Sequence, residues 1–172
     1  MTRAVLSLGS NLGDRFGHLQ AAVAGFGEAV RAVSPVYETA PWGGVAQDDF
    51  LNAVLVVQDA GTDAWGWLRR GQELERAAER VREVRWGPRT LDVDVVTVQG
   101  PDGAVASEDP ELLLPHPGTP QRATVLRPWL DVEPEAVLPG HGPVAALLAT
   151  LGPDAENGMR RRDDLVLVGA RR

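Results

Sequence analysis

Two segments with helical spacing of apolar residues, each flanked by strand-like segments, constrain the fold of this chain more than any other feature. Apolar residues recur at steps of three and four from Leu19 to Val30, and at steps of seven from Trp67 to Val81, as expected for two amphipathic helices. Runs rich in valine, leucine and threonine precede, separate and follow them. We therefore expect one helix after a capping Asp14 and another at residues 63–82. The expected strands are residues 3–8, 33–39, 50–58 and 91–98.

The resulting order is strand, helix, strand, strand, helix, strand, which is the ferredoxin-like pattern. It predicts an α+β fold with a mixed or antiparallel sheet and helices packed on it. A length of 172 residues with 44% hydrophobic residues favours one domain over residues 1–172. Residues 143–151 read as a last short helix. We expect an edge strand at residues 165–168, whose place in the sheet the pattern does not fix, and the extension 152–172 has no assigned role.

Composition excludes several classes of protein. Cysteine is absent, which excludes disulfides, zinc thiolates and thiol catalysis. A formal net charge of −7 argues against nucleic acid as a partner. No apolar run approaches the ~20 residues that a membrane span needs, and the N-terminus lacks the features of a signal peptide, so we expect a cytoplasmic protein.

The basic residues point to a small anionic ligand. All 17 are arginine, which base composition explains most simply, but seven of them lie between Arg69 and Arg89. Guanidinium groups match phosphate oxygens in a bidentate manner, so such a cluster on an acidic protein favours a phosphate ligand.

The pair Asp92 and Asp94 is the strongest local signal for chemistry. Residues two apart on a strand point to the same side, so two carboxylates would repel each other on a partly buried face unless a cation compensates them. Magnesium prefers such oxygen ligands. The alternative is an edge strand that simply exposes Asp94 to solvent. Arg89, three residues before Asp92, favours a ligand made of metal and phosphate.

Two further groups of residues carry weaker signals. One polar stripe is formed by Gln72, Glu75, Glu79 and Arg82, and it leads into an arginine-rich loop where a phosphate lid could lie. The alternative is a solvated helix face. Phe50 and Asn52 share a strand face and could stack on and hydrogen-bond to a heterocycle, although a core phenylalanine and a strand-end asparagine explain them equally well. The chain has no lysine, and therefore no Gly-x-x-x-x-Gly-Lys phosphate loop.

Together these motifs resemble the hydroxymethyldihydropterin pyrophosphokinase family over residues 6–130. The segments that carry the resemblance are Leu8-Gly-Ser-Asn-Leu12, Tyr37-Glu-Thr-Ala-Pro-Trp-Gly43, Asp49-Phe-Leu-Asn-Ala53, Arg85-Trp-Gly-Pro-Arg-Thr-Leu-Asp-Val-Asp94, and Leu114-Pro-His-Pro117 followed by Arg122. The resemblance implies transfer of the β,γ-pyrophosphate of ATP to 6-hydroxymethyl-7,8-dihydropterin, with two magnesium ions, by a monomer in folate biosynthesis. Its alternatives are an inactive nucleotide-binding module of the same fold and a sheet-based RNA binder.

The resemblance also implies roles for individual residues. The catalytic set is Arg80, Arg82, Arg89, Asp92 and Asp94, of which the two aspartates hold the metal. The nucleotide-binding set is Gln72, Glu75, Arg85, Trp86, Val95, His116 and Arg122. The pterin-binding set is Thr39, Trp42, Phe50 and Asn52. The chain departs from the family pattern at Thr124, where the resemblance implies an aromatic residue that covers the pterin.

Overall fold

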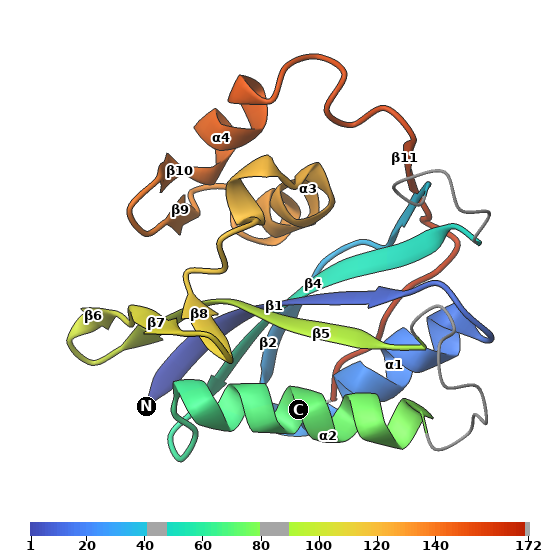
Figure 1. The fold of residues 1–172 in the computed structure, drawn as a ribbon. Helices are drawn as coiled ribbons and strands as arrows, with labels where there is room; N and C mark the ends of the chain where they lie inside the picture. Colours follow the sequence, from blue (N-terminus) through green and yellow to red (C-terminus); the bar gives the residue numbers. More distant parts are fainter. Residues whose placement is uncertain (41–47, 80–89, 171–172) are drawn as a thin grey trace.

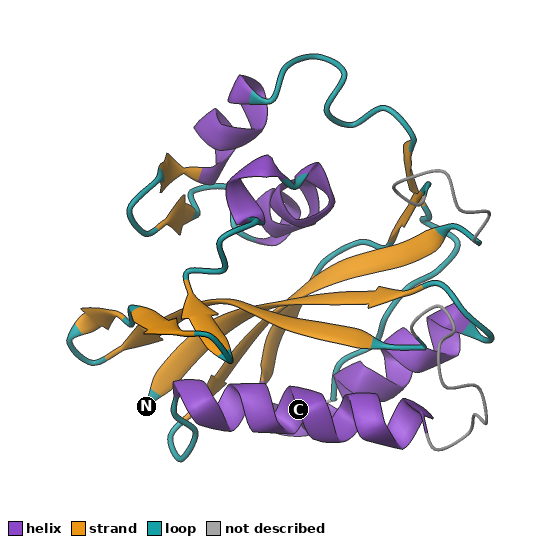
Figure 2. Ribbon diagram, viewed as in Figure 1, coloured by secondary structure: helices purple, strands orange, loops and turns teal. Residues whose placement is uncertain are grey.

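The computed structural model describes residues 1–40, 48–79 and 90–170, and shows a sheet with helices on both faces (Figures 1 and 2). The strands of the main sheet are β1 (Thr2–Ser10), β2 (Val30–Val33), β3 (Tyr37–Thr39), β4 (Phe50–Asp59), β5 (Asp92–Gly100), β6 (Gly103–Ala104) and β11 (Met159–Arg161). The helices are α1 (Arg15–Phe26), α2 (Ala64–Glu79), α3 (Ala123–Val132) and α4 (Val144–Thr150). Short elements complete the described chain: η1 (Gly27–Ala29), η2 (Thr119–Gln121), and two small sheets made of β7 (Ser107–Asp109) with β8 (Leu112–Leu114) and β9 (Val137–Leu138) with β10 (Gly142–Pro143).

The sheet topology confirms the expected α+β class. The strand order is β11-β3-β4-β1-β5-β6, β2 also pairs with β4, and every pairing is antiparallel. Helix α1 connects β1 to β2, and α2 connects β4 to β5. The four strand positions β5, β1, β4 and β2/β3 with these two crossover helices make up the ferredoxin-like arrangement.

Local backbone chemistry explains two departures from the expected elements. Asp14 caps α1 as predicted, accepting a hydrogen bond from the Gly17 N–H at 3.0 Å, but the helix ends at Gly27, whose φ of 56° few other residues adopt. Val30 therefore lies in β2 and not in the helix. The strand expected at residues 33–39 is two strands, because Pro35 between them has no N–H to donate to a ladder.

The C-terminal part of the chain differs most from expectation. The edge strand expected at residues 165–168 is wrong: the edge strand is β11, and Leu167 is instead buried in the core. The sequence pattern also did not predict α3, which contains Pro128 within its span. The last expected helix is present as α4.

Two apolar cores lie on opposite faces of the sheet (Figure 2). On one face, alternate residues such as Leu6, Leu8 and Leu55 pack with α1 and α2, where Trp67 is fully buried. On the other face, Val5, Val54 and Val96 pack with α3 and α4. Among the described residues, no helix combines the length and the apolar character needed to cross a membrane.

Candidate active site

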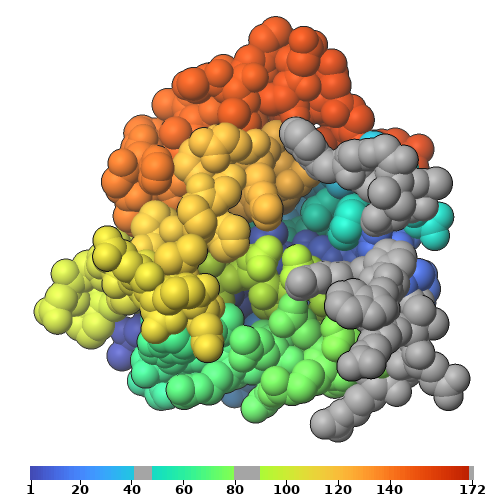
Figure 3. Space-filling view, in the orientation of Figure 1, coloured from blue at the N-terminus to red at the C-terminus, as the bar shows by residue number. Residues whose placement is uncertain are grey.

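A cavity of about 970 Å³ lies on the α3 face of the sheet, a volume at the upper end of the range for small-molecule sites (Figure 3). It exists because the side chains on this face of the three central strands, β1, β4 and β5, are different at the two ends of each strand. Strand residues under α3 and α4 are valines, whereas the residues further along the same face are small or polar, with the exception of Phe50, and they face the cavity. The strand residues that line the cavity are Ser7 and Gly9 of β1, Thr39 of β3, Phe50 and Asn52 of β4, and Asp92 and Asp94 of β5.

The acidic pair lies along one side of this cavity. Asp92 and Asp94 are both half-buried and both line it, while Val93 between them points to the opposite face and is buried. Helix α2 fixes this part of β5: the Val93 N–H donates to Glu75 Oε2 at 3.2 Å, and Gly71 lies so close that a Cβ there would be 2.9 Å from Val93 Cγ1. Two carboxylates held on one face of a strand are a donor set that suits magnesium.

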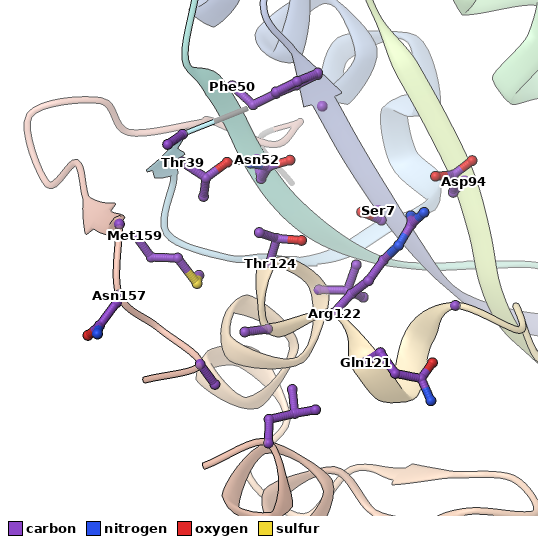
Figure 4. Close-up of a pocket in the computed structure, with 18 of the residues that line it drawn as sticks. Ser7, Thr39, Phe50, Asn52, Asp94, Gln121, Arg122, Thr124, Asn157 and Met159 are labelled. Carbon is purple, nitrogen blue, oxygen red and sulfur yellow. Dashed lines mark hydrogen bonds between the residues drawn. The ribbon is translucent and has the colours of Figure 1, made fainter. Parts of the chain in front are cut away.

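The other side of the cavity has an apolar surface and an amide. Asn52 Nδ2 donates to Thr39 Oγ1 at 2.8 Å, which orients the amide, and Phe50 lies next to this pair (Figure 4). Gly9 separates the two sides, since it pairs with Asn52 on one neighbouring strand and with Asp92 on the other. Strands lie about 4.8 Å apart, so the amide and the first carboxylate belong to backbones about 10 Å apart.

Arg122 enters the cavity from the residue before α3. Its side chain extends toward the sheet, with the guanidinium directed at Ser7 and Asp94 (Figure 4). Gly118 makes room for it, because a Cβ at that position would lie 3.2 Å from Arg122 Nε. His116 fixes the loop that precedes Arg122. The backbone N–H of His116 donates to Val96 O at 2.9 Å, and its ring Nδ1 accepts from the Gly118 N–H at 3.3 Å.

Helix α3, whose first residues line the cavity, is held to β3 by a polar contact. The Tyr37 hydroxyl donates to Asp131, which also accepts from Arg127 at 3.1 Å. Burial, together with the Asp131 carboxylate, raises the pKa of Tyr37 to about 12. The hydroxyl therefore keeps its proton, and so remains a donor, throughout the neutral range.

The structure does not bring all of the expected residues to the cavity. Gln72 is exposed on α2, and neither Gln72 nor Glu75 lines the cavity. The Val95 side chain is buried on the face covered by α1 and α2, and His116 does not line the cavity. Six expected residues lie outside the described part of the chain: Trp42, Arg80, Arg82, Arg85, Trp86 and Arg89.

Sequence reasoning missed several residues of the cavity. Ser7 falls in the strand expected at residues 3–8, and Gly9 in a segment that carries the family resemblance, but neither is among the expected site residues. Small residues in a central strand can indicate a close approach of ligand. A C-terminal group also lines the cavity, and no sequence pattern pointed to it: Leu151, Asp154, Ala155, Asn157, Gly158 and Met159.

Comparison with known proteins identifies relatives of this chain. Residues 5–134 match the family model described as 7,8-dihydro-6-hydroxymethylpterin-pyrophosphokinase. The 2-amino-4-hydroxy-6-hydroxymethyldihydropteridine pyrophosphokinase of Mycobacterium leprae is 51% identical over 169 residues, which cover 93% of this chain and 88% of the relative. The proteins of the same name from Mycobacterium tuberculosis and Methylorubrum extorquens are 49% and 42% identical, covering 93% and 89% of this chain and 89% and 96% of theirs.

Solved structures show the same fold at low identity. A crystal structure of wild-type Plasmodium falciparum HPPK-DHPS aligns over 93% of this chain with a TM-score of 0.66 and 14% identity. This chain spans about half of that protein, 48% of its length. On the family match and the identity to these relatives, the chain belongs to the 7,8-dihydro-6-hydroxymethylpterin-pyrophosphokinase family.

Proposed function

We propose that this chain transfers the β,γ-pyrophosphate of ATP to the hydroxymethyl oxygen of 6-hydroxymethyl-7,8-dihydropterin in folate biosynthesis, with AMP as the second product. Family membership supports this activity. The observation that carries it at the level of residues is the position of Gly9, which lies between Asn52 on one strand and Asp92 on the other. A heterocycle beside Asn52 would thus present a short substituent toward the acidic side of the same cavity.

The two sides of the cavity suit the two substrates. Phe50 offers a flat apolar surface, and the Asn52 amide, oriented by Thr39, offers both a donor and an acceptor to the polar edge of a pterin. Asp92 and Asp94 would hold two magnesium ions beside the ATP phosphates. Bound there, magnesium would neutralise charge on the phosphate oxygens.

Arginine side chains would stabilise the charge that develops as the bridging oxygen of AMP leaves the β-phosphorus. Arg122 is directed at the acidic side of the cavity, which is where the phosphates would lie (Figure 4). We also assign Arg80, Arg82 and Arg89 to this task, and Arg85 and Trp86 to the nucleotide, on the basis of the family resemblance. For the same reason we assign Trp42 to the pterin and Gln72, Glu75, Val95 and His116 to the nucleotide side.

We also propose that one domain over residues 1–172 acts as a monomer, on the basis of the family resemblance. We place the reaction in the cytoplasm, where ATP is available. In the reaction a bond forms between the hydroxymethyl oxygen and the β-phosphorus, the bond from that phosphorus to the bridging oxygen breaks, and the hydroxyl proton passes to solvent.

Product analysis tests the proposal. Purified protein is incubated with ATP, magnesium and 6-hydroxymethyl-7,8-dihydropterin, and nucleotides are separated by chromatography. We expect AMP and pterin pyrophosphate in equal amounts, with no AMP when either magnesium or pterin is omitted. Release of ADP, or AMP formation that does not depend on pterin, would contradict the proposal. Asp94→Asn protein, prepared in the same way, controls for contaminating ATPases.

A further inference from the structure

The C-terminal segment supplies one wall of the cavity. Residues from Leu151 to Met159 line it opposite the strands, and they lie beyond residue 134, where the match to the family model ends. Figure 1 shows this segment leaving α4, reaching the β3 edge as β11, and continuing toward α1. The wall thus belongs to a part of the chain to which the family match assigns no role.

Strand pairing and ion pairs fix this wall in place. In the antiparallel pairing of β11 with β3, Met159 lies beside Thr39 and Arg160 beside Glu38. The backbone N–H of Arg162 donates to Val36 O at 2.8 Å, which continues the pairing beyond β11. The segment is anchored again on the far face of the sheet, where Leu167 is buried and Val168 exchanges two hydrogen bonds with Gln20, at 2.8 and 2.9 Å.

Glu38 makes the side-chain ion pairs that attach the C-terminal segment to the sheet. Its carboxylate accepts from Arg162 at 3.1 Å, from Arg160, and from Arg15 of α1 at 3.0 Å. Burial alone would raise the pKa of Glu38, but the hydrogen bonds from Arg15 and Arg160 outweigh burial and hold this pKa below its ordinary value. The carboxylate is therefore charged at neutral pH and links the segment to both β3 and α1.

Within this wall, Met159 is the residue aimed at the pterin side. Its side chain leaves β11 beside Thr39 and extends toward Thr124, while Phe50 lies on the other side of the Thr39–Asn52 pair (Figure 4). The short side chain of Thr124 leaves the space into which the thioether reaches. Methionine is flexible and polarisable, and its sulfur makes favourable contacts with aromatic rings.

We propose that Met159 covers the face of the dihydropterin that Phe50 does not cover, and that it sets pterin affinity without contributing to ATP affinity. This inference rests on the proposed function, because it assigns the heterocycle to the space between Phe50 and Met159. The simpler view is that Met159 only packs against the core under α3, which it also contacts. The two views differ in what a substitution does to binding.

Titration calorimetry distinguishes them. The probe is 6-hydroxymethylpterin, titrated into protein saturated with magnesium and an ATP analogue whose α,β-bridge is methylene. For Met159→Ala we expect the pterin Kd to rise about tenfold, which corresponds to about 1.4 kcal/mol, while the Kd of the analogue alone stays within about twofold. Met159→Leu, which keeps an apolar side chain of similar size, should stay close to wild type.

Control variants and contrary outcomes complete the test. Val166→Ala changes an exposed residue of the same segment outside the cavity and should bind both ligands like wild type. If Met159→Ala melts at too low a temperature for titration, Met159→Gln, matched in length but polar, takes its place with the same expected loss. Unchanged pterin affinity, or equal losses for pterin and the analogue, would overturn the role of Met159. Absence of pterin binding by the wild-type protein would instead overturn the proposed function.

Discussion

Gly9→Ala is expected to weaken pterin binding while changing the stability of the protein only slightly. Gly9 lies in the middle of the sheet, and its φ is not in the left-handed region, so alanine fits the backbone. The added Cβ would point into the cavity, 3.3 Å from Asn52 Oδ1 and 3.8 Å from Phe50 Cδ1. The first distance is slightly shorter than an ordinary contact, so Asn52 has to move by a few tenths of an ångström.

The two effects of this substitution on stability oppose each other. Alanine replaces glycine inside a strand with a gain of roughly 0.5–1 kcal/mol, and the close contact with Asn52 removes part of that gain. We expect the free energy of unfolding to change by less than about 1 kcal/mol in either direction. The cost for the ligand is larger, because a methyl group in a filled site costs about 1–3 kcal/mol, which corresponds to a loss in pterin affinity of roughly 5- to 150-fold.

The assay combines thermal unfolding with titration of 6-hydroxymethylpterin in the presence of magnesium and the ATP analogue. Gly61→Ala is the matched control, since a Cβ at that position meets nothing within 4 Å and its φ is also outside the left-handed region. Pterin affinity of Gly9→Ala within twofold of wild type would refute the reasoning, because the ligand would then not approach the floor of the cavity between Asn52 and Asp92.

Three further predictions concern the phosphate side of the cavity and the β3 edge. Asp94→Asn should lower the rate of AMP formation by about 100-fold or more, and full activity would contradict the magnesium assignment. Gly118→Ala fits the backbone at that position (φ −80°, ψ −10°) but places a Cβ 3.2 Å from Arg122 Nε. We expect the displaced guanidinium to lower kcat about tenfold. An unchanged kcat would show that Arg122 acts elsewhere. Glu38→Gln should cost about 1–3 kcal/mol near pH 7. Because the folded pKa of Glu38 is lowered, the stability difference from wild type should be full above its ordinary value of 4.5 and should shrink as the pH falls through the lowered pKa, as measured by urea unfolding; a difference independent of pH would contradict the ionic role.

Much of the fold follows from local patterns in the sequence. The cap at Asp14, the helix around Trp67 and the strand carrying the two aspartates each depend on residues close together in the chain. The alternation of side chains along β5 correctly puts Asp92 and Asp94 on one face. The same alternation puts the Val95 side chain on the opposite face, although the family resemblance assigned this residue to the nucleotide side.

The parts that could not be predicted depend on contacts between distant residues. Met159 reaches the cavity only because its strand pairs with Thr39, 120 residues earlier in the chain, and a three-residue strand with two arginines has no distinctive pattern. Helix α3 was missed because Pro128 within it argues against a helix when read locally. Its position depends on the contact of Tyr37 with Asp131, which joins two segments far apart in the sequence.

On the α3 face of the sheet, one end is covered by helices and the other end is open. The covered end stabilises the fold, and the open end forms the candidate site. Under α3 the central strands carry Val5 and Val54, whose complete or nearly complete burial stabilises the domain. Two residues further along the same face, at Ser7 and Asn52, apolar side chains would allow the helices to close over the whole sheet, and the cavity would be lost. The open end instead keeps small or polar residues at Ser7, Gly9 and Asn52, and the C-terminal wall of the cavity is attached through Glu38 and strand pairing. Variants of Ser7 and Gly9 that increase stability should therefore be the ones that lose substrate binding.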